Sequence, residues 1–531
     1  MISTQDGQEG VPVKWGKVID HNRCIGCHAC TVACKQEHDV PIGVTRTYVK
    51  QVEVGTFPNV RRHFQINRCN QCDDPPCVDI CPTAAMRLRP DGIVDFDRDR
   101  CIGCKACIAA CPYDAIYIDP NSHSAEKCNF CSHRVDRGFQ PACVTVCPTQ
   151  AIFIGNLSDA ESEVSKLIAR EKLDVRKPEK HTNPRLFYIN ASQYTLTPTT
   201  AEFAGAFPHT QVPETDVRPR ENDRLNGSLN KGRRGEAGDP SRTAAAAIIS
   251  YDNSHRAPWD WRVSLYTWSK SVAAGVFLLA GVLGIAGFEL SRALEATAAL
   301  IALGFLALTA VLLIWDLSHP ERFLFSLIKP QPKSWLVWGA YLITAYTGFL
   351  GLFLLTLLLD IEGLIQTVRW VGVFLAAGAG GYTALLFGQA KARDLWQEPG
   401  LPLHLMLQIG LAGSAVLVLV MQGIDVSRDV SEMVRWVFLG TAGLHLLLSL
   451  GHVVMPHPTA DGARAARNLA WGRYGSFYWT GIAGGAAVPL LLMLSSTVPG
   501  PAASVGAALA LVGLALYEHA YVQAAQSVPL S

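Results

Sequence analysis

Sixteen cysteines lie within one stretch of the 531-residue chain, between Cys24 and Cys147. They form four groups of four: Cys24, Cys27, Cys30 and Cys34; Cys69, Cys72, Cys77 and Cys81; Cys101, Cys104, Cys107 and Cys111; and Cys128, Cys131, Cys143 and Cys147. The first and third groups have the spacing C-x2-C-x2-C-x3-C. In this spacing a tight turn brings three thiolates to one [4Fe-4S] cluster, and the fourth cysteine binds a neighbouring cluster. The cysteines therefore predict four [4Fe-4S] clusters.

The segments that follow the cysteine groups repeat one another. Proline follows the last cysteine in three groups, as Pro82, Pro112 and Pro148, whereas Lys35 follows Cys34. The strings Cys-Pro-Thr-Ala-Ala, Cys-Pro-Tyr-Asp-Ala-Ile and Cys-Pro-Thr-Gln-Ala-Ile begin at Cys81, Cys111 and Cys147. These repeats indicate duplication of one cluster-binding unit.

Disulfides and structural zinc are the alternative uses of these cysteines. Disulfide-rich domains are typically small and secreted, but residues 1–16 contain no apolar segment typical of a signal peptide. Zinc binds C-x2-C pairs. Four consecutive quartets with this spacing and with following prolines favour iron-sulfur clusters over zinc.

Charge divides the chain into two halves. From residue 264 to the end, 13 basic and 13 acidic residues occur among 268 positions, about 10%, whereas the charged share of residues 1–263 is about 25%. The net charge of +1 gives no electrostatic reason to expect a nucleic-acid partner. The chain is therefore a polar half followed by an apolar half.

The apolar half predicts eight membrane helices, because a membrane helix needs about 20 apolar residues. The approximate limits are 265–288, 296–315, 335–359, 370–388, 402–421, 436–455, 477–494 and 504–523. Residues 195–260 are rich in Pro, Gly, Asn, Arg and Thr and predict a flexible linker. We expect a multidomain protein with an α+β ferredoxin-like domain at 1–194, this linker, and an all-α bundle of eight transmembrane helices at 261–531.

Loop charge predicts the orientation of the bundle. With a cytoplasmic N-terminus, the inside loops carry 8 Lys or Arg residues and the outside loops carry 4, which agrees with the positive-inside rule. Residues 1–15 contain no twin-arginine signal for export of a folded domain. We therefore expect a protein of the inner (cytoplasmic) membrane whose iron-sulfur domain faces the cytoplasm.

The polar half resembles the four-cluster electron-transfer subunit of the complex iron-sulfur molybdoenzymes, such as dimethyl sulfoxide, polysulfide and nitrate reductases. Besides the cysteine groups, residues 155–165 and 184–189 are similar to the segment that closes that domain. The resemblance implies four cubanes, with the third-group cluster towards the membrane and the first-group cluster towards the catalytic subunit. The implied ligand sets are Cys24, Cys27, Cys30 with Cys147; Cys69, Cys72, Cys77 with Cys111; Cys101, Cys104, Cys107 with Cys81; and Cys128, Cys131, Cys143 with Cys34.

The apolar half resembles the NrfD or polysulfide-reductase type of quinone-reactive anchor, a family of eight-helix proteins without haem. The similar stretches are 261–275, 316–323, 332–335 with 338–339, 382–391 and 521–531. The resemblance implies that the protein binds membrane lipid and a quinone, either menaquinone or ubiquinone. Fusion of both subunits in one polypeptide departs from the usual separate arrangement and fixes their proximity without a docking affinity.

Ionisable and polar residues in or beside the predicted spans are candidates for quinone chemistry, because their desolvation is costly. We expect Asp316 or His319 to relay protons, Tyr382 or Lys270 to hydrogen-bond a quinone oxygen, and Arg322 to organise the pocket. Gln389 and Lys391 lie near the same end of the fourth predicted span. Structural alternatives remain, since Asp316 and Arg322 can pair to fix a loop and a lysine can extend to the headgroups.

Four histidines of the apolar half suggest a competing cofactor. His445 and His452 are seven residues apart and share a helix face, and His404 and His519 lie in other predicted spans. Buried histidines can ligate haem, but membrane histidines also bond neighbouring helices or carry protons. The family resemblance implies no haem.

No motif for a molybdenum pterin, nucleotide or flavin occurs in the chain. We expect an electron-transfer and membrane-anchor subunit that works between a separate molybdopterin catalytic subunit, acting on a sulfur compound or sulfite, and the quinone pool. One alternative is the anchor of a quinone-linked hydrogenase. Another is an ion-translocating or scaffold module of a higher-order respiratory complex.

Overall fold

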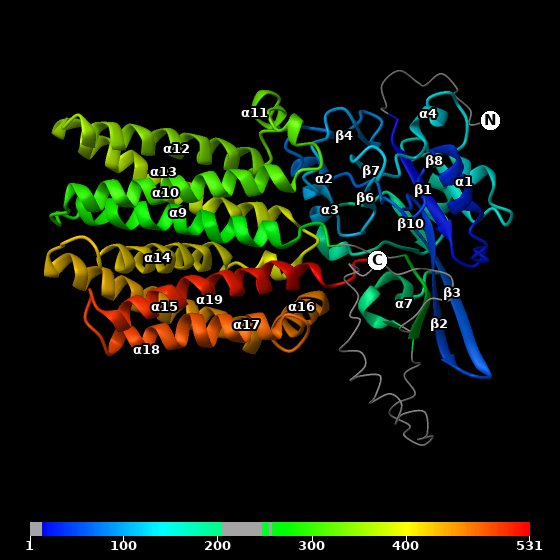
Figure 1. The fold of residues 1–531 in the computed structure, drawn as a ribbon. Coiled ribbons are helices and arrows are strands. Elements are labelled where there is room, and N and C mark those ends of the chain that lie inside the picture. Colours follow the sequence, from blue (N-terminus) through cyan, green and yellow to red (C-terminus); the bar gives the residue numbers. More distant parts are fainter. Residues whose placement is uncertain (1–12, 204–246, 254–256) are drawn as a thin grey trace. The chain divides into compact units, whose positions relative to one another are not determined.

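The chain folds into two compact units. The computed structural model describes residues 13–203, 247–253 and 257–531. The cysteine-rich unit contains the described residues up to Pro258 together with Ala390–Ala392 and Val528–Ser531. The helical unit contains Trp259–Gln389 and Arg393–Ser527 (Figure 1).

The first sheet of the cysteine-rich unit has the strand order β8-β1-β10-β9. Its strands are β1 (Trp15–Asp20), β8 (Ile152–Asn156), β9 (Leu173–Asp174) and β10 (Leu186–Ile189). β1 pairs in parallel with β10 and antiparallel with β8. Successive side chains point to opposite faces, so Ile19 packs towards Cys30 and Cys143 while Val18 packs with Val164 of helix α6 (Glu163–Arg170). One face of this sheet therefore supports cysteines.

The second sheet has the order β11-β12-β2-β3. Its strands are β2 (Tyr48–Thr56), β3 (Asn59–Asn67), β11 (Glu202–Phe203) and β12 (Ala247–Tyr251). Part of the linker predicted at residues 195–260 forms strands in the structure. Strands β11 and β12 lie within that range and pair in this sheet. Ala247 and Ile249 are buried and Ile248 is exposed, as expected for alternating side chains of a strand. Burial of the two apolar side chains helps to offset the conformational entropy lost when this short segment is ordered. Two groups of basic residues within the predicted linker, at 218–224 and 231–234, lie outside the described residues.

Short elements separate the cysteines. The helices are α1 (Ala29–Glu37), α2 (Pro76–Asp79), α3 (Ala106–Ala110), α4 (Ser132–Val135), α5 (Ala142–Thr145) and α7 (Gln193–Leu196). The hairpins pair β4 (Met86–Leu88) with β5 (Val94–Phe96) and β6 (Ile116–Ile118) with β7 (Ala125–Lys127). The predicted α+β ferredoxin-like class is confirmed.

The helical unit confirms the prediction of eight helices long and apolar enough to cross a membrane. They are α9 (Trp261–Ile285), α10 (Arg292–Asp316), α12 (Trp335–Leu358), α13 (Glu362–Gln389), α14 (Leu401–Val420), α15 (Arg428–Val454), the span of α17 (Gly475–Ile482) and α18 (Val488–Leu494), and α19 (Pro501–Gln526). A π-helical segment, Ala483–Ala487, joins α17 to α18. Shorter elements are α11 (Phe325–Ile328) and α16 (Ala460–Ala470).

Helix α9 packs against α10, α13, α14 and α19. Its approach to α14 depends on two glycines, since a Cβ on Gly275 would lie 2.1 Å from the carbonyl oxygen of Ile409 and would also meet Gly413. Small residues allow such close packing between membrane helices. Because the helices alternate in direction, α9 begins and α19 ends at one end of the bundle, the Trp261 end. The connections 317–334, 390–400 and 455–474 lie at this end too.

The last four residues belong to the cysteine-rich unit, although they were expected in the membrane domain. The hydroxyl of Tyr48 donates to Ser531 Oγ at 2.8 Å, and Nη2 of the buried Arg176 donates to the carbonyl oxygen of Leu530 at 2.9 Å. Leu530 and Ser531 are buried by these contacts. The bonded residues are far apart in the sequence, so no local pattern predicts that the C-terminal residues pack in this unit.

Candidate electron-transfer sites

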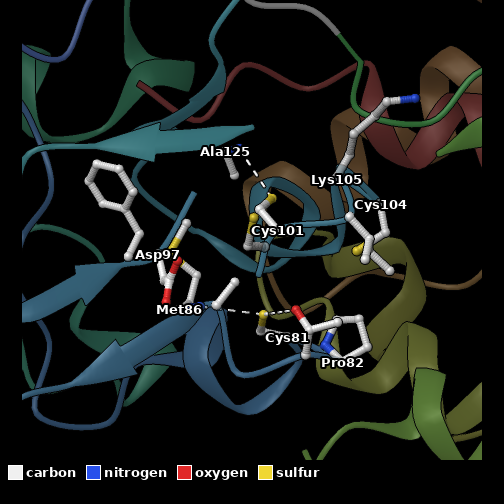
Figure 2. Close-up of a pocket in the computed structure, with 13 residues that line it drawn as sticks. Cys81, Pro82, Met86, Asp97, Cys101, Cys104, Lys105 and Ala125 are labelled. Carbon is white, nitrogen blue, oxygen red and sulfur yellow. Dashed lines mark hydrogen bonds between the residues drawn. The ribbon is translucent and has the colours of Figure 1, made fainter. Parts of the chain in front are cut away.

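Four cysteines line one cavity of about 370 Å³ in the cysteine-rich unit, site III: Cys81, Cys101, Cys104 and Cys107. Figure 2 shows the hairpin strands and the loop before α3 around it. The backbone N–H groups of Gly103 and Ala125 point at Cys101 Sγ, each with N···S 3.4 Å, and that of Met86 points at Cys81 Sγ at 3.4 Å. Hydrogen bonds to sulfur stabilise thiolates and tune the potential of a bound cluster.

A second cavity, of about 290 Å³, is lined by Cys24, Cys27, Cys30 and Cys147, and is called site I. The N–H of Ala151 points at Cys147 Sγ at 3.2 Å. In both cavities three cysteines come from one sequence group and the fourth comes from another. These are the two ligand sets that the family resemblance implied for the first and third groups.

The remaining eight cysteines make up the other two ligand sets that the family resemblance implies. Site II consists of Cys69, Cys72, Cys77 and Cys111, whose thiols are close enough for their charges to interact. Site IV consists of Cys34, Cys128, Cys131 and Cys143, linked by the same kind of interaction. Twelve of the sixteen cysteines are buried. The exceptions are Cys24, Cys27, Cys104 and Cys147.

One backbone turn recurs in the first C-x2-C pair of each of the four cysteine groups. The residue before the second cysteine has a positive φ in each pair: 70° at Gly26, 68° at Gly103, 48° at Gln71 and 57° at Phe130. Glycine adopts this conformation without strain. At Gln71 the side chain secures the turn, because its Oε1 accepts from the N–H of Val94 and its Nε2 donates to the carbonyl oxygen of Cys128, both at 2.7 Å. The recurrence supports the duplication predicted from the sequence repeats.

Two cations lie beside Cys143 of site IV. Burial raises the pKa of Cys34 to about 12 and that of Cys131 to about 11. Burial also opposes ionisation of Cys143, but Arg68 and Lys17 outweigh it and lower the pKa of this thiol to about 7. Arg68 Nη1 lies 3.0 Å and Lys17 Nζ 3.8 Å from Cys143 Sγ. Both cations are buried, so site IV favours added negative charge.

The four sites fit [4Fe-4S] clusters by their donor sets. Each presents four cysteine sulfurs, which is the ligand set of such a cluster. Within residues 13–203, 247–253 and 257–531, no three His, Cys, Asp or Glu side chains gather as the ligands of a single metal ion. The cysteines are spread around cavities instead of meeting at one point.

In the helical unit, the structure brings Lys270 and Tyr382 together. Lys270 of α9 is fully buried, its amine donates to the carbonyl oxygen of Gly380, and Nζ lies 5.0 Å from the centroid of the Tyr382 ring. A buried amine beside a buried phenol offers two hydrogen-bonding groups to an apolar molecule that carries oxygens. The sequence predicts that one or the other of these two residues hydrogen-bonds a quinone oxygen.

The other candidates lie at the Trp261 end without joining that pair. Asp316 is buried and lies 3.4 Å from Nη2 of Arg262. Nδ1 of His319 lies 2.9 Å from a carboxylate oxygen of Glu321, which also faces Arg322 at 3.8 Å. These residues form charge pairs around the loop that follows α10.

Gln389 and Lys391 have different surroundings. The Gln389 side chain accepts from the N–H of Trp335 at 2.9 Å and donates to the carbonyl oxygen of Lys333 at 2.6 Å. Gln389 thus ties the end of α13 to the start of α12. Lys391 groups with the cysteine-rich unit and is not brought to Lys270.

Sequence reasoning missed three buried or half-buried acidic residues of the helical unit. Glu518 of α19 is 1% exposed and faces the charge of Lys270. Glu295 of α10 pairs with Arg369 of α13, with 2.5 Å between oxygen and nitrogen. Glu398 contacts His452. A lone carboxylate inside an apolar run, as at Glu518, was the available signal.

Together, the four cysteine sites and the bundle of membrane-length helices define a multi-pass membrane protein that carries iron-sulfur electron-transfer sites. Comparison with known families then specifies the class. The profile described as "Polysulphide reductase, NrfD" matches residues 250–529, and profiles for a 4Fe-4S binding domain and a 4Fe-4S dicluster domain match residues 21–37 and 60–157. The protein belongs to the NrfD polysulphide reductase family, joined in one polypeptide to the iron-sulfur subunit of an oxidoreductase complex.

Curated relatives match the cysteine-rich part. A tetrathionate reductase subunit of Salmonella typhimurium is 42% identical over 195 residues, covering 36% of this chain and 78% of the relative. A polysulfide reductase component of Wolinella succinogenes is 44% identical over 179 residues, covering 33% and 94%. The arsenate respiratory reductase iron-sulfur subunit ArrB of Shewanella sp. is 36% identical over 227 residues, covering 34% and 97%.

Proposed function

We propose that the protein carries electrons through four [4Fe-4S] clusters, held at sites I to IV, between a separate catalytic subunit and a membrane quinone. The observation that carries this proposal is the assembly of sixteen cysteines into four sets of four, two of which line cavities. When bound, such clusters accept and release electrons. The protein supplies the sulfur ligands, the N–H groups that stabilise them, and the charges around each site.

The quinone site of the proposal is built on Lys270 and Tyr382. Lys270 offers N–H groups and Tyr382 offers a hydroxyl, both inside an apolar bundle. These groups can hydrogen-bond a quinone oxygen and orient the ring. Ionisable residues buried in a membrane domain are expensive to desolvate and are usually functional. Menaquinone and ubiquinone both present such oxygens.

The catalytic partner of the proposal is a molybdopterin subunit that acts on a small sulfur or other inorganic compound. The names of the relatives, which include tetrathionate, polysulfide, arsenate and selenate reductases, support a partner of this class. A hydrogenase partner is the alternative, and it would bring nickel to the complex.

Metal analysis of the native complex tests the cluster assignment. We expect roughly 16 irons per copy of this chain, because four sites each take four irons, together with molybdenum from the partner. Nickel in place of molybdenum would support the hydrogenase alternative. Zinc in place of iron would contradict the electron-transfer function.

Two substitutions test the quinone site. Lys270→Met and Tyr382→Phe should each lower reduction of a water-soluble quinone analogue by about tenfold or more, by analogy with the loss of a positioned polar group, while the cluster EPR spectra stay unchanged. Tyr341→Phe is the matched control, since Tyr341 is an exposed tyrosine of α12. Charge movement across vesicles without any quinone turnover would favour the ion-translocating alternative.

A further inference from the structure

Three histidines and one glutamate form a connected chain at the Trp261 end of the bundle. Nδ1 of His452 lies 2.6 Å from Oε2 of Glu398. Nε2 of His452 lies 3.1 Å from Nδ1 of His404, and Nε2 of His404 lies 2.8 Å from Nδ1 of His445. His404 belongs to α14, and His445 and His452 belong to α15. All three histidines are buried, at 4% exposure or less.

The contacts use the ring nitrogens in one consistent sense. A neutral imidazole has one N–H donor and one acceptor nitrogen. Nδ1 of His404 can donate to Nε2 of His452, and Nδ1 of His445 can donate to Nε2 of His404. Nδ1 of His452 lies within ion-pair distance of the Glu398 carboxylate. When a proton arrives at Nε2 of His445, each ring can pass its own Nδ1 proton to the next ring, from His445 to His404 and from His404 to His452. His452 then releases a proton towards Glu398. The reverse movement needs only the opposite tautomers. Histidine acts as a proton shuttle in this way.

The histidine chain leads from the surface end of the bundle into its interior. Glu398 precedes α14, in the connection between α13 and α14, and its side chain is 34% exposed. His452 is the third residue from the end of α15, and His445 lies seven residues further in, about 10 Å at 1.5 Å per residue. The outer member is therefore within reach of water, and the inner member is not.

Helix α19 packs beside both the inner end of this histidine chain and helix α9, which carries Lys270. The ring of Tyr517 lies 4.8 Å from that of His445 and 5.5 Å from that of His404, measured between centroids. The next residue, Glu518, is buried and interacts with the charge of Lys270. Adjacent residues of one helix thus face the histidines and the lysine.

We propose that Glu398, His452, His404 and His445 form a proton relay between the Trp261 end of the bundle and the Lys270–Glu518 pair. The proposal rests on the proposed quinone function. Reduction of a quinone to a quinol consumes two electrons and two protons. The clusters of the complex supply the electrons, and the relay supplies the protons from water through Glu398. Oxidation of a quinol sends the protons in the opposite direction.

The test uses the complete complex in phospholipid vesicles with a water-soluble naphthoquinone as the probe. Stopped-flow absorbance of the clusters follows the electrons, and a pH-sensitive dye follows the protons. His404→Gln should slow proton uptake and quinone turnover by about tenfold or more, the lower end of what proton transfer by a positioned group contributes. The solvent isotope effect should rise, while the cluster EPR spectra and the KM for the quinone should not change.

Two further variants keep the test decisive. Glu398→Gln lies outside the helices and should fold even where a buried substitution fails. It should slow turnover less than His404→Gln, because water can partly replace a half-exposed group. His519→Gln is the matched control, since His519 contacts the rings of Tyr474 and Phe477 on the other face of α19, and its turnover should equal that of the unmodified protein.

The outcomes separate the relay from the quinone function. Unchanged turnover, proton uptake and isotope effect in both His404→Gln and Glu398→Gln would overturn the relay and leave the quinone function intact. Absence of naphthoquinone turnover in the unmodified complex would instead overturn the quinone function, and the relay with it. Slowed turnover with an unchanged isotope effect and an altered KM would assign these residues a packing role and overturn the relay.

Discussion

At the scale of single residues, buried positive charge lies beside Cys143 of site IV. Arg68 and Lys17 both approach Cys143, and Nε2 of His38 lies 3.2 Å from Cys131 Sγ. Backbone N–H groups lie beside the thiols of sites I and III. A full positive charge in a buried site favours the more negative, reduced state of a cluster more strongly than a dipole does. The surroundings of site IV should therefore raise the potential of its cluster.

Arg68→Gln tests this inference. Loss of the guanidinium charge should lower the reduction potential of the site IV cluster by about 60 mV, a tenfold change in a one-electron equilibrium. A redox titration followed by EPR measures the shift. Arg68→Lys retains the charge and should restore most of the potential. Equal potentials in Arg68→Gln and the unmodified protein would contradict an electrostatic role for Arg68.

At the scale of elements, the left-handed turn in the first C-x2-C pair of each cysteine group positions the thiols. Gly26 combines a positive φ with a crowded site, because an added Cβ would lie 2.3 Å from the ring of Phe64 in β3. The first group therefore needs glycine for two physical reasons. Gln71 and Phe130 hold the same turn with side chains, at a conformational cost that their surroundings must offset.

Gly26→Ala should disturb site I selectively. The strained turn and the contact with Phe64 should displace Cys24 and Cys27, and the iron content should fall from about 16 to about 12 per chain because one cluster is lost. Iron analysis with EPR measures this change. Gly43→Ala is the matched control, since Gly43 also has a positive φ but an added Cβ would meet nothing within 4 Å. Equal iron loss in both variants would show that strain alone is responsible.

At the scale of the whole molecule, the membrane orientation is a prediction from loop charge. The connections at the Trp261 end carry more Lys and Arg than those at the opposite end, and such loops stay in the cytoplasm. We propose that the cysteine-rich unit therefore faces the cytoplasm.

Epitope tags measure this orientation. A tag at the N-terminus should be accessible to antibody in inside-out vesicles and protected in intact spheroplasts. A tag in the connection between α9 and α10, at residues 286–291, should show the opposite pattern. Accessibility of the N-terminal tag in intact spheroplasts would contradict a cytoplasmic cysteine-rich unit.

The sequence alone determined the class of both units, because cysteine spacing and long apolar runs are local signals. Ligand spacing reports which thiols a turn can bring together, and helix length reports the thickness of the membrane. The pairing of Lys270 with Tyr382 depended on tertiary structure, as did the connection from Glu398 to His445. Neighbours on different helices are chosen by packing, which no single stretch of sequence records. The strand β12 and the buried tail at Ser531 were missed for the same reason, since their hydrogen-bond partners lie hundreds of residues away.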